Sequence, residues 1–242
     1  MADASRDATT RQVSTAMGRL HVADHGGDEP ALILMHGFPD DSRIYNRLVP
    51  LLSPRRAVAF DFLGYGGSDR PRTGTLDSAG HVHQLGAVLD ELGIETAVLV
   101  GHDASGPVAI DYALTAPERV GKLILLNTYY GHAPALRVPE MIRLLADPDM
   151  TPLADAMLND PGQRMWLLGH TARQFGGDPL DPDSVGMVAI AEELGQHGGD
   201  PDAVGVEGVS AELAGGVAQQ PHALVGVVEH GVGQRRHVRV GQ

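Results

Sequence analysis

The sequence predicts an α/β fold built on a doubly wound, mostly parallel sheet, and two observations carry that prediction. Through the first 130 residues, short apolar runs alternate with longer segments whose apolar residues recur at helical spacing. Beyond residue 130 the apolar runs stop, and helical patterns continue to about residue 175. We therefore expect an α/β core over residues 12–130, a helical cap or lid over 131–175, and an atypical tail over 176–242, in which the C-terminal strands are missing or aberrant.

Each element follows from a local pattern. Continuous apolar runs, typical of strands covered on both faces, are found at 31–35, 57–60, 97–100 and 121–126, after a hairpin at 13–16 and 20–24. Helical patterns are found at 76–92, 107–116, 139–146 and 153–175. A further helix is expected after Ser42, which can cap it. Its apolar face would comprise Ile44, Leu48, Leu51 and Leu52.

The charge and composition of the chain argue against several classes of function. The formal net charge is −13, so a nucleic-acid backbone or an anionic lipid surface is repelled. The absence of cysteine excludes disulfides and thiolate chemistry. Residues 1–11 are small and polar, and no apolar run is long enough to span a bilayer. We therefore expect a cytoplasmic enzyme that acts on a small molecule, uses no metal or other cofactor, and has no nucleic-acid or membrane partner.

The segment at 98–106, Val-Leu-Val-Gly-His-Asp-Ala-Ser-Gly, has the outline of a nucleophile elbow. A strand leads into a tight turn and then a helix, and Asp103 lies at the apex of the turn. The apex residue is held in a strained backbone conformation, so its neighbours must be small. Gly101, Ser105 and Gly106 meet this requirement. The pattern therefore indicates Asp103 as the nucleophile.

Two other interpretations of this segment stay open. Ser105 is the nucleophile of an ordinary esterase if the motif is displaced by two residues, although Pro107 then stands where a small flexible residue is favoured. Alternatively, Asp103 only caps the helix that begins near Ala104, which is a common role for aspartate. Three further segments favour the elbow.

His-Gly-Phe-Pro at 36–39, directly after a buried strand, resembles the oxyanion-hole loop of the α/β hydrolases. The glycine-rich stretch at 61–71 resembles the loop after the next strand in epoxide hydrolases and haloalkane dehalogenases. Pro-Glu-Arg-Val at 117–120 resembles the link into strand 6. The resemblance covers roughly residues 12–175. It implies an α/β-hydrolase fold with oxyanion donors at the backbone N–H groups of Phe38 and Ala104.

An aspartate nucleophile selects the reaction for a chemical reason. A carboxylate is ionised at neutral pH, so it can attack an sp3 carbon without a base. Epoxides and alkyl halides are such electrophiles, and the resulting ester is cleaved by water with help from a histidine and an acid. Dehalogenases usually have a halide-binding tryptophan where this chain has Ala104, and often asparagine where it has Phe38. The resemblance thus favours an epoxide hydrolase, with a haloalkane dehalogenase as the alternative.

Few aromatic residues are candidates for contact with substrate. Epoxide hydrolases open the ring with tyrosines of the lid, but the last tyrosines of this chain are Tyr129 and Tyr130. Trp166 is the one aromatic residue with a donor N–H in the expected lid, although such a tryptophan is more often a core residue than a halide ligand. These three residues are the candidate lid contacts.

The partners of the nucleophile are not recognisable in the sequence. In the family an acid follows strand 6 or 7 and a histidine follows strand 8, but Asn127 stands at the end of strand 6. The histidines of the tail lie outside family-like contexts: His222, His230 and His237. His36 and His102 flank the site, where such histidines pack loops. The catalytic histidine and acid are therefore unassigned. A truncated or non-catalytic homologue stays an alternative, as does a shifted reading frame in the tail.

Overall fold

The computed structural model describes residues 8–71, 78–130, 140–176, 226–229 and 239–240. The chain divides into two compact units. The first contains residues 1–72, 78–131 and 222–242, and the second contains residues 73–77 and 132–221. Each unit is described by itself.

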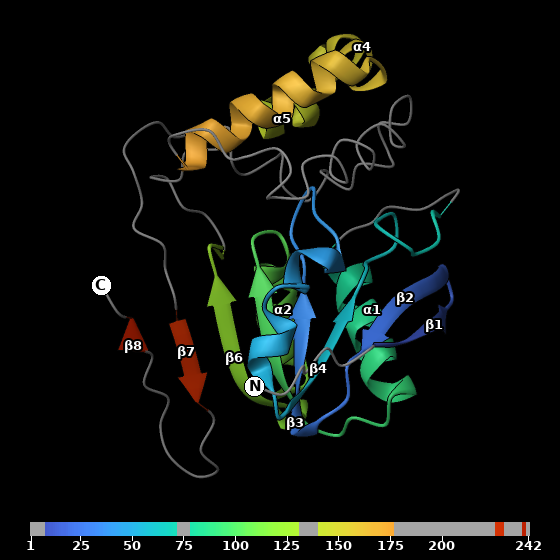
Figure 1. Cartoon of the computed structure of the whole chain (residues 1–242), viewed down its shortest axis with the longest axis vertical. Helices are drawn as coiled ribbons and strands as arrows, with labels where there is room; N and C mark the ends of the chain where they lie inside the picture. The colour runs from blue at the N-terminus through green and yellow to red at the C-terminus, as the bar shows by residue number, and fades with distance from the viewer. Residues whose placement is uncertain (1–7, 72–77, 131–139, 177–225, 230–238, 241–242) are drawn as a thin grey trace. The chain divides into compact units, whose positions relative to one another are not determined.

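The first unit is built on one sheet with strand order β1-β2-β4-β3-β5-β6-β7-β8 (Figure 1). Its strands are β1 Thr9–Thr15, β2 Gly18–Asp24, β3 Asp28–Met35, β4 Arg55–Phe60, β5 Ala97–His102, β6 Val120–Leu126, β7 Gly226–Glu229 and β8 Arg239–Val240. The four central strands, β4-β3-β5-β6, are parallel, and the pairs toward both edges are antiparallel. The predicted fold class, the hairpin and the buried strands are confirmed.

The central strands explain why the apolar runs predict them so well. The side chains of Ile33 in β3 and Leu99 in β5 are fully buried and pair across the sheet, as expected for strands covered on both faces. Parallel strands end at a common edge of the sheet. The loops after the carboxyl ends of β3, β4, β5 and β6 therefore begin at that edge, with His36, Asp61, Asp103 and Asn127.

Helices and short turns cover the two faces of this sheet. Helices α1 Ser78–Glu91 and α2 Ser105–Thr115 lie on one face, and the 3-10 turns η1 Ser42–Tyr45 and η2 Val49–Leu52 lie on the other (Figure 1). Tyr45 and Val49 pack into a core cluster with Leu34 and Val100. Helix α2 begins two residues earlier than predicted, so Pro107 lies in its first turn, where proline is tolerated.

The helix predicted after Ser42 is wrong. Two separate 3-10 turns replace it, and the expected apolar face is largely in solvent, with Leu51 79% exposed. Pro50 lacks an N–H and would clash inside a continuous helix, so the chain starts a new turn at Val49. The cap is also a different residue, because the Asp41 carboxylate accepts from the Arg43 N–H at 2.9 Å.

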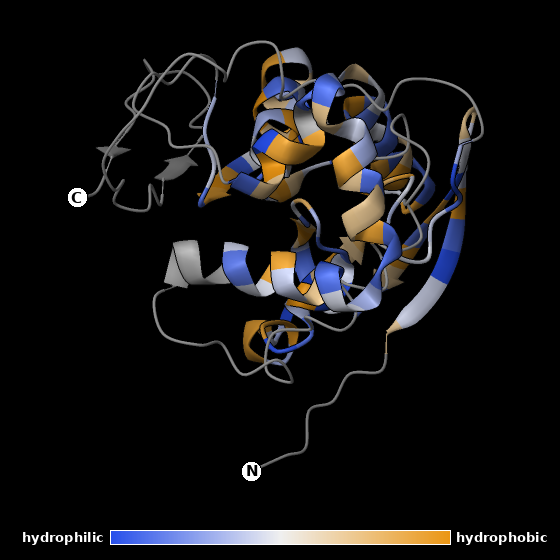
Figure 2. Cartoon of the chain, turned by 90° about the horizontal axis from the view of Figure 1, so that it is seen from above, coloured by the Kyte–Doolittle hydropathy of each residue, from blue (hydrophilic) through white to orange (hydrophobic). Residues whose placement is uncertain are grey.

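The second unit is helical where it is described. It contains α3 Glu140–Ala146, the 3-10 turn η4 Pro148–Met150, α4 Thr151–Asn159 and α5 Pro161–Gly176. The single helix predicted at 153–175 is wrong, because the Asp160 side chain caps a new helix at Pro161 by accepting from the Gln163 N–H at 2.8 Å. Apolar and polar residues alternate along the helices (Figure 2). None of the helices that the structure describes could cross a membrane.

The described part of the tail adds two short strands to the sheet. β7 pairs antiparallel with β6, with Val227 opposite Ile124, and β8 pairs antiparallel with β7. The tail, in which the sequence predicts missing or aberrant C-terminal strands, thus contributes a short strand at Gly226–Glu229. The other expectations for the tail fall at 177–225 and 230–238, outside the described residues, as do His222, His230 and His237.

Candidate active site

Asp103 occupies the tight turn between β5 and α2. Its φ is 51°, a left-handed conformation that costs a non-glycine residue roughly 1–2 kcal/mol. Three hydrogen bonds hold it there. The Asp103 N–H donates to the Leu126 carbonyl at 3.1 Å, and the Asp103 carbonyl accepts from the Gly106 N–H at 3.1 Å and from Thr128 Oγ1 at 2.5 Å. The apex is therefore anchored to the end of β6 as well as to its own helix.

The glycines around Asp103 are required by close packing. A Cβ on Gly37 would lie 2.5 Å from Asp103 Cβ, and a Cβ on Gly106 would lie 2.0 Å from Thr128 Oγ1. A Cβ on Gly101 would meet the backbone of α2 at 3.0 Å. The expectation of small neighbours thus has a steric cause, which extends to Gly37 on a different loop.

The loop at 36–39 meets the Asp103 carboxylate directly. The Phe38 N–H donates to Asp103 Oδ2 at 2.9 Å, and the Asp103 side chain is half-buried. Ala104 is exposed and is the first residue before α2. Among the described residues, nothing accepts a hydrogen bond from the Ala104 N–H. The structure thus brings Phe38 to the carboxylate and leaves the neighbouring N–H of Ala104 available.

The two other interpretations of the elbow have little support in this geometry. The helix α2 has no side-chain cap, because the cap residue is Ala104 and the Asp103 carboxylate is bound by the Phe38 N–H. Ser105 is 2% exposed. Its hydroxyl lies 2.9 Å from the carbonyl oxygens of Met35 and His102, and it accepts from the His102 N–H at 2.9 Å. A buried hydroxyl bound to backbone on three sides is a structural group.

His36 joins two loops of the site. Its ring is buried, and Nδ1 lies 2.8 Å from the Gly37 carbonyl while Nε2 accepts from the Phe62 N–H at 3.1 Å. This pair of contacts requires the neutral ring with its proton on Nδ1, since one nitrogen must donate and the other accept. His36 therefore has the loop-packing role that the resemblance implied.

His102 has a different environment. Burial lowers its pKa, and the negative charge of Asp103 acts in the opposite direction. Within the described part of the chain, its Nδ1 is buried and has no hydrogen-bond partner. His102 thus lies next to Asp103 in sequence, and its ring favours the neutral form.

Asp40 is a residue of the site that the sequence did not single out. Burial, followed by the negative charges of Asp103 and Asp41, raises the pKa of Asp40 to about 7. Its N–H closes the turn by donating to the Gly37 carbonyl at 3.2 Å. In the sequence, Asp40 is the first of two aspartates directly after His-Gly-Phe-Pro, and nothing in that local pattern distinguishes it from Asp41. Near neutral pH the site therefore has one carboxyl group that is half protonated beside one that is the candidate nucleophile.

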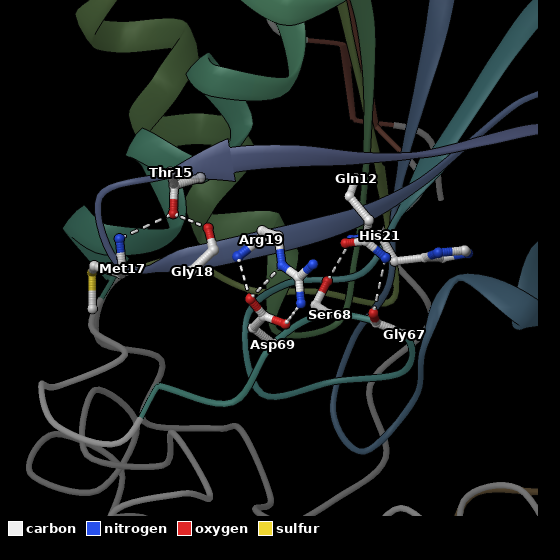
Figure 3. Close-up of polar contacts among 9 residues, drawn as sticks. All are labelled: Gln12, Thr15, Met17, Gly18, Arg19, His21, Gly67, Ser68 and Asp69. Carbon is white, nitrogen blue, oxygen red and sulfur yellow. Dashed lines mark hydrogen bonds and ion pairs between the residues drawn. The ribbon is translucent and has the colours of Figure 1, made fainter.

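The glycine-rich loop after β4 is fixed by hydrogen bonds at both ends. Asp61 is buried and accepts from the Ser42 N–H at 2.7 Å and the Gly67 N–H at 2.9 Å. At the other end, Asp69 binds the guanidinium and the N–H of Arg19 at 2.9–3.0 Å (Figure 3). The loop thus links the 42–45 turn to the β1–β2 hairpin, and so supports the loop that carries Phe38.

The candidate lid contacts lie in different settings. Burial and, to a smaller extent, the negative charge of Asp103 raise the pKa of Tyr129, whereas the Tyr130 hydroxyl donates to Asp111 at 2.9 Å. Trp166 belongs to the helical unit, where it is 57% exposed and stacks on His170 with ring centroids 5.2 Å apart. Asn127 is exposed at the end of β6 with a φ of 47°.

Among the described residues, no group of three or more histidine, aspartate or glutamate side chains is placed to hold a metal ion. The groups gathered around Asp103 are a carboxylate bound by the Phe38 N–H, the neighbouring N–H of Ala104, and the Asp40 carboxyl group, whose pKa is raised to about 7.

Comparison with known proteins gives a consistent family. The model of the alpha/beta hydrolase fold family matches residues 30–159, which is more than half of the chain. Haloalkane dehalogenase 2 of Mycobacterium tuberculosis is 31% identical over 140 residues, 57% of this chain and 49% of that protein. Epoxide hydrolase 3 of Siraitia grosvenorii is 37% identical over 115 residues, 46% of this chain and 36% of that protein.

Lipase LipV of Mycobacterium tuberculosis is 37% identical over 139 residues, 57% of this chain and 52% of that protein. The chain thus spans about half or less of the length of these curated relatives. The solved structure of epoxide hydrolase CorEH superposes with a TM-score of 0.68 at 21% identity, covering 86% of this chain and 75% of that one. At that identity the likeness concerns the fold alone.

Proposed function

The chain belongs to the α/β hydrolase fold family, and from this premise we propose that it attacks an sp3 carbon of a small molecule through Asp103. Attack would form an ester between the Asp103 carboxylate and the substrate carbon. The carbon–oxygen bond of an epoxide, or the carbon–halogen bond of a haloalkane, breaks in the same step. Of the two, we favour the epoxide.

One observation carries this proposal, namely the placement of the Asp103 carboxylate. It stands on a left-handed apex at the carboxyl edge of the sheet, with Oδ2 bound to the Phe38 N–H at 2.9 Å. That oxygen is held by a donor, which leaves the other oxygen to attack. When the ester is later cleaved, the held oxygen becomes the oxyanion, and the Phe38 and Ala104 N–H groups would stabilise it.

The preference for an epoxide rests on the groups beside the carboxylate. A departing halide ion is stabilised by hydrogen-bond donors that are neutral or positively charged, and Ala104 offers no side-chain donor. A departing alkoxide needs a proton, and two proton carriers feel the charge of Asp103: Asp40, whose pKa is raised to about 7, and the Tyr129 phenol. The dehalogenase activity stays the second candidate because a relative with that name is 31% identical.

The test is covalent labelling of the full chain. Styrene oxide and 1-bromobutane are incubated separately with the wild-type protein, with Asp103→Asn and with Ser105→Ala, and intact masses are measured. We expect one adduct on the wild type and on Ser105→Ala, mapped by digestion to the peptide around Asp103, and none on Asp103→Asn. Faster labelling by the epoxide supports the first candidate, and faster labelling by the bromide supports the second.

Two results would refute the proposal. No adduct with either reagent would favour the non-catalytic homologue. Hydrolysis of a p-nitrophenyl ester that survives Asp103→Asn but not Ser105→Ala would favour the serine esterase.

A further inference from the structure

The hydroxyl of Thr128 lies against the elbow from the end of β6. Its Oγ1 lies 2.5 Å from the Asp103 carbonyl oxygen and 3.5 Å from that of Tyr129. A hydroxyl has one proton, so the shorter contact receives it. Gly106 leaves room for this side chain, because a Cβ there would lie 2.0 Å from Oγ1. The Thr128 side chain thus packs against the backbone of Asp103, at the apex of the turn.

The Asp103 carbonyl and the Ala104 N–H belong to the same peptide unit. A peptide unit is planar and trans, so its C=O and N–H point in opposite directions and rotate together. The carbonyl end is fixed by Thr128 Oγ1 and the Gly106 N–H. The other end is the Ala104 N–H, which has no acceptor among the described residues. Fixing the carbonyl therefore fixes the direction of a donor beside the Asp103 carboxylate.

We propose that Thr128 is a positioning residue, which binds the Asp103 carbonyl and so aims the Ala104 N–H as the second oxyanion donor, beside that of Phe38. The inference rests on the proposed function and refines its second step. Alkylation removes negative charge from the carboxylate, so a donor gives no advantage there. Cleavage of the ester builds negative charge on the held oxygen, and there the donor stabilises the transition state.

The experiment compares Thr128→Val, which keeps the shape and removes the hydroxyl, with Thr128→Ser, which keeps the hydroxyl. Full-length proteins are labelled with styrene oxide, and the adduct is then released from the folded protein by hydroxylamine, with both steps followed by intact mass. In Thr128→Val we expect release to slow by about ten-fold or more, and alkylation to change by less than about three-fold. Thr128→Ser should restore most of the release rate.

The possible results distinguish a failure of this inference from a failure of the proposed function. Equal release rates in Thr128→Val and wild type overturn the role of Thr128 alone. Parallel slowing of both steps, or a Thr128→Ser variant as slow as Thr128→Val, assigns the side chain a purely structural role and also overturns it. Failure of the wild type to form an adduct overturns the proposed function and the inference together. If circular dichroism shows Thr128→Val unfolded, Thr128→Ala supplies the same comparison.

Discussion

The centre of the sheet and its C-terminal edge differ in construction. In the centre, β3 pairs with parallel strands on both sides, and its residues Ile33 and Met35 are fully buried. At the edge, β7 has four residues and β8 has two, and both are antiparallel to their neighbours. Strands buried on both faces hold their loops in place, whereas short edge strands contribute little burial.

This difference maps onto the two steps of the proposed reaction. The nucleophile and the Phe38 donor are attached to β5 and β3, in the well-packed centre. The histidine that cleaves the ester would, by the family resemblance, follow the last strand. In the proposed reaction, the first step therefore uses residues attached to the centre of the sheet, while the second would also need a histidine placed by its short-stranded edge.

The largest effect that we expect is that the wild-type protein is labelled by an epoxide but does not turn it over. After excess epoxide, the wild-type protein should hold one adduct for hours, because an unactivated water attacks an ester slowly and both ring nitrogens of His36 are engaged with backbone. Intact mass over time measures this. Steady production of diol would contradict this prediction, because it would mean that the tail supplies the base that activates water.

A smaller effect is expected on stability from Gly106→Ala, where the new Cβ would lie 2.0 Å from Thr128 Oγ1. Overpacking of this kind costs about 1–3 kcal/mol. The matched control is Gly86→Ala in α1, where the nearest atom, on Tyr112, is 3.5 Å away and alanine should stabilise the helix by up to about 1 kcal/mol. Thermal unfolding midpoints that fall equally in both variants would contradict the close packing of the elbow.

The carboxyl group of Asp40 predicts a dependence of stability on pH. Its folded pKa is raised to about 7, above the ordinary value near 4, so the folded state holds a proton that the unfolded state has lost. Its contribution is fully present below about pH 4 and is lost as the pH rises to about 7. Asp40→Asn should therefore gain stability over the wild type between pH 5 and pH 8, by roughly 2–4 °C in Tm for each kcal/mol.

Parallel melting curves at pH 5, 6, 7 and 8 provide the measurement. Asp103→Asn is the second arm, because loss of its charge should lower the pKa of Asp40 and reduce the same pH dependence. A constant difference between wild type and Asp40→Asn across this range would rule out a raised pKa at this position.

The smallest effect is expected from Phe38→Ala. Phe38 binds the carboxylate through its backbone N–H, which alanine keeps, so removal of the ring should change the alkylation rate by less than about three-fold. Labelling kinetics test this. A loss above ten-fold would show that the side chain, and not the backbone alone, belongs to the site.

Sequence patterns predicted the centre of the sheet because apolar runs such as 97–100 reflect burial on both faces, which is a local property. They failed where one residue overrides the pattern. The spacing of Ile44, Leu48 and Leu51 fits a helix, but Pro50 breaks it, and Asp160 divides the expected lid helix in the same way. Both residues are visible in the sequence, but the prediction gave more weight to the helical spacing of the apolar residues around them.

The site was predictable to the extent that it lies within motifs. Asp103 and Phe38 belong to segments with a recognisable pattern, and the structure brings them within 2.9 Å. The roles of Asp40 and Thr128 depend on which loops meet in space. Their charge and hydrogen-bond environment comes from residues far along the chain, such as Asp103, so no local pattern reveals them.

The carboxylate at the left-handed apex also has an evolutionary consequence. A serine at that position needs a neighbouring base before it can react at all, so a lineage that loses its last strand loses every step of the chemistry at once. An aspartate there is reactive from the moment the central strands fold. Under the proposed function, a lineage with such an apex would therefore keep the capture of one electrophile per molecule as long as its central strands fold, and selection could act on that activity.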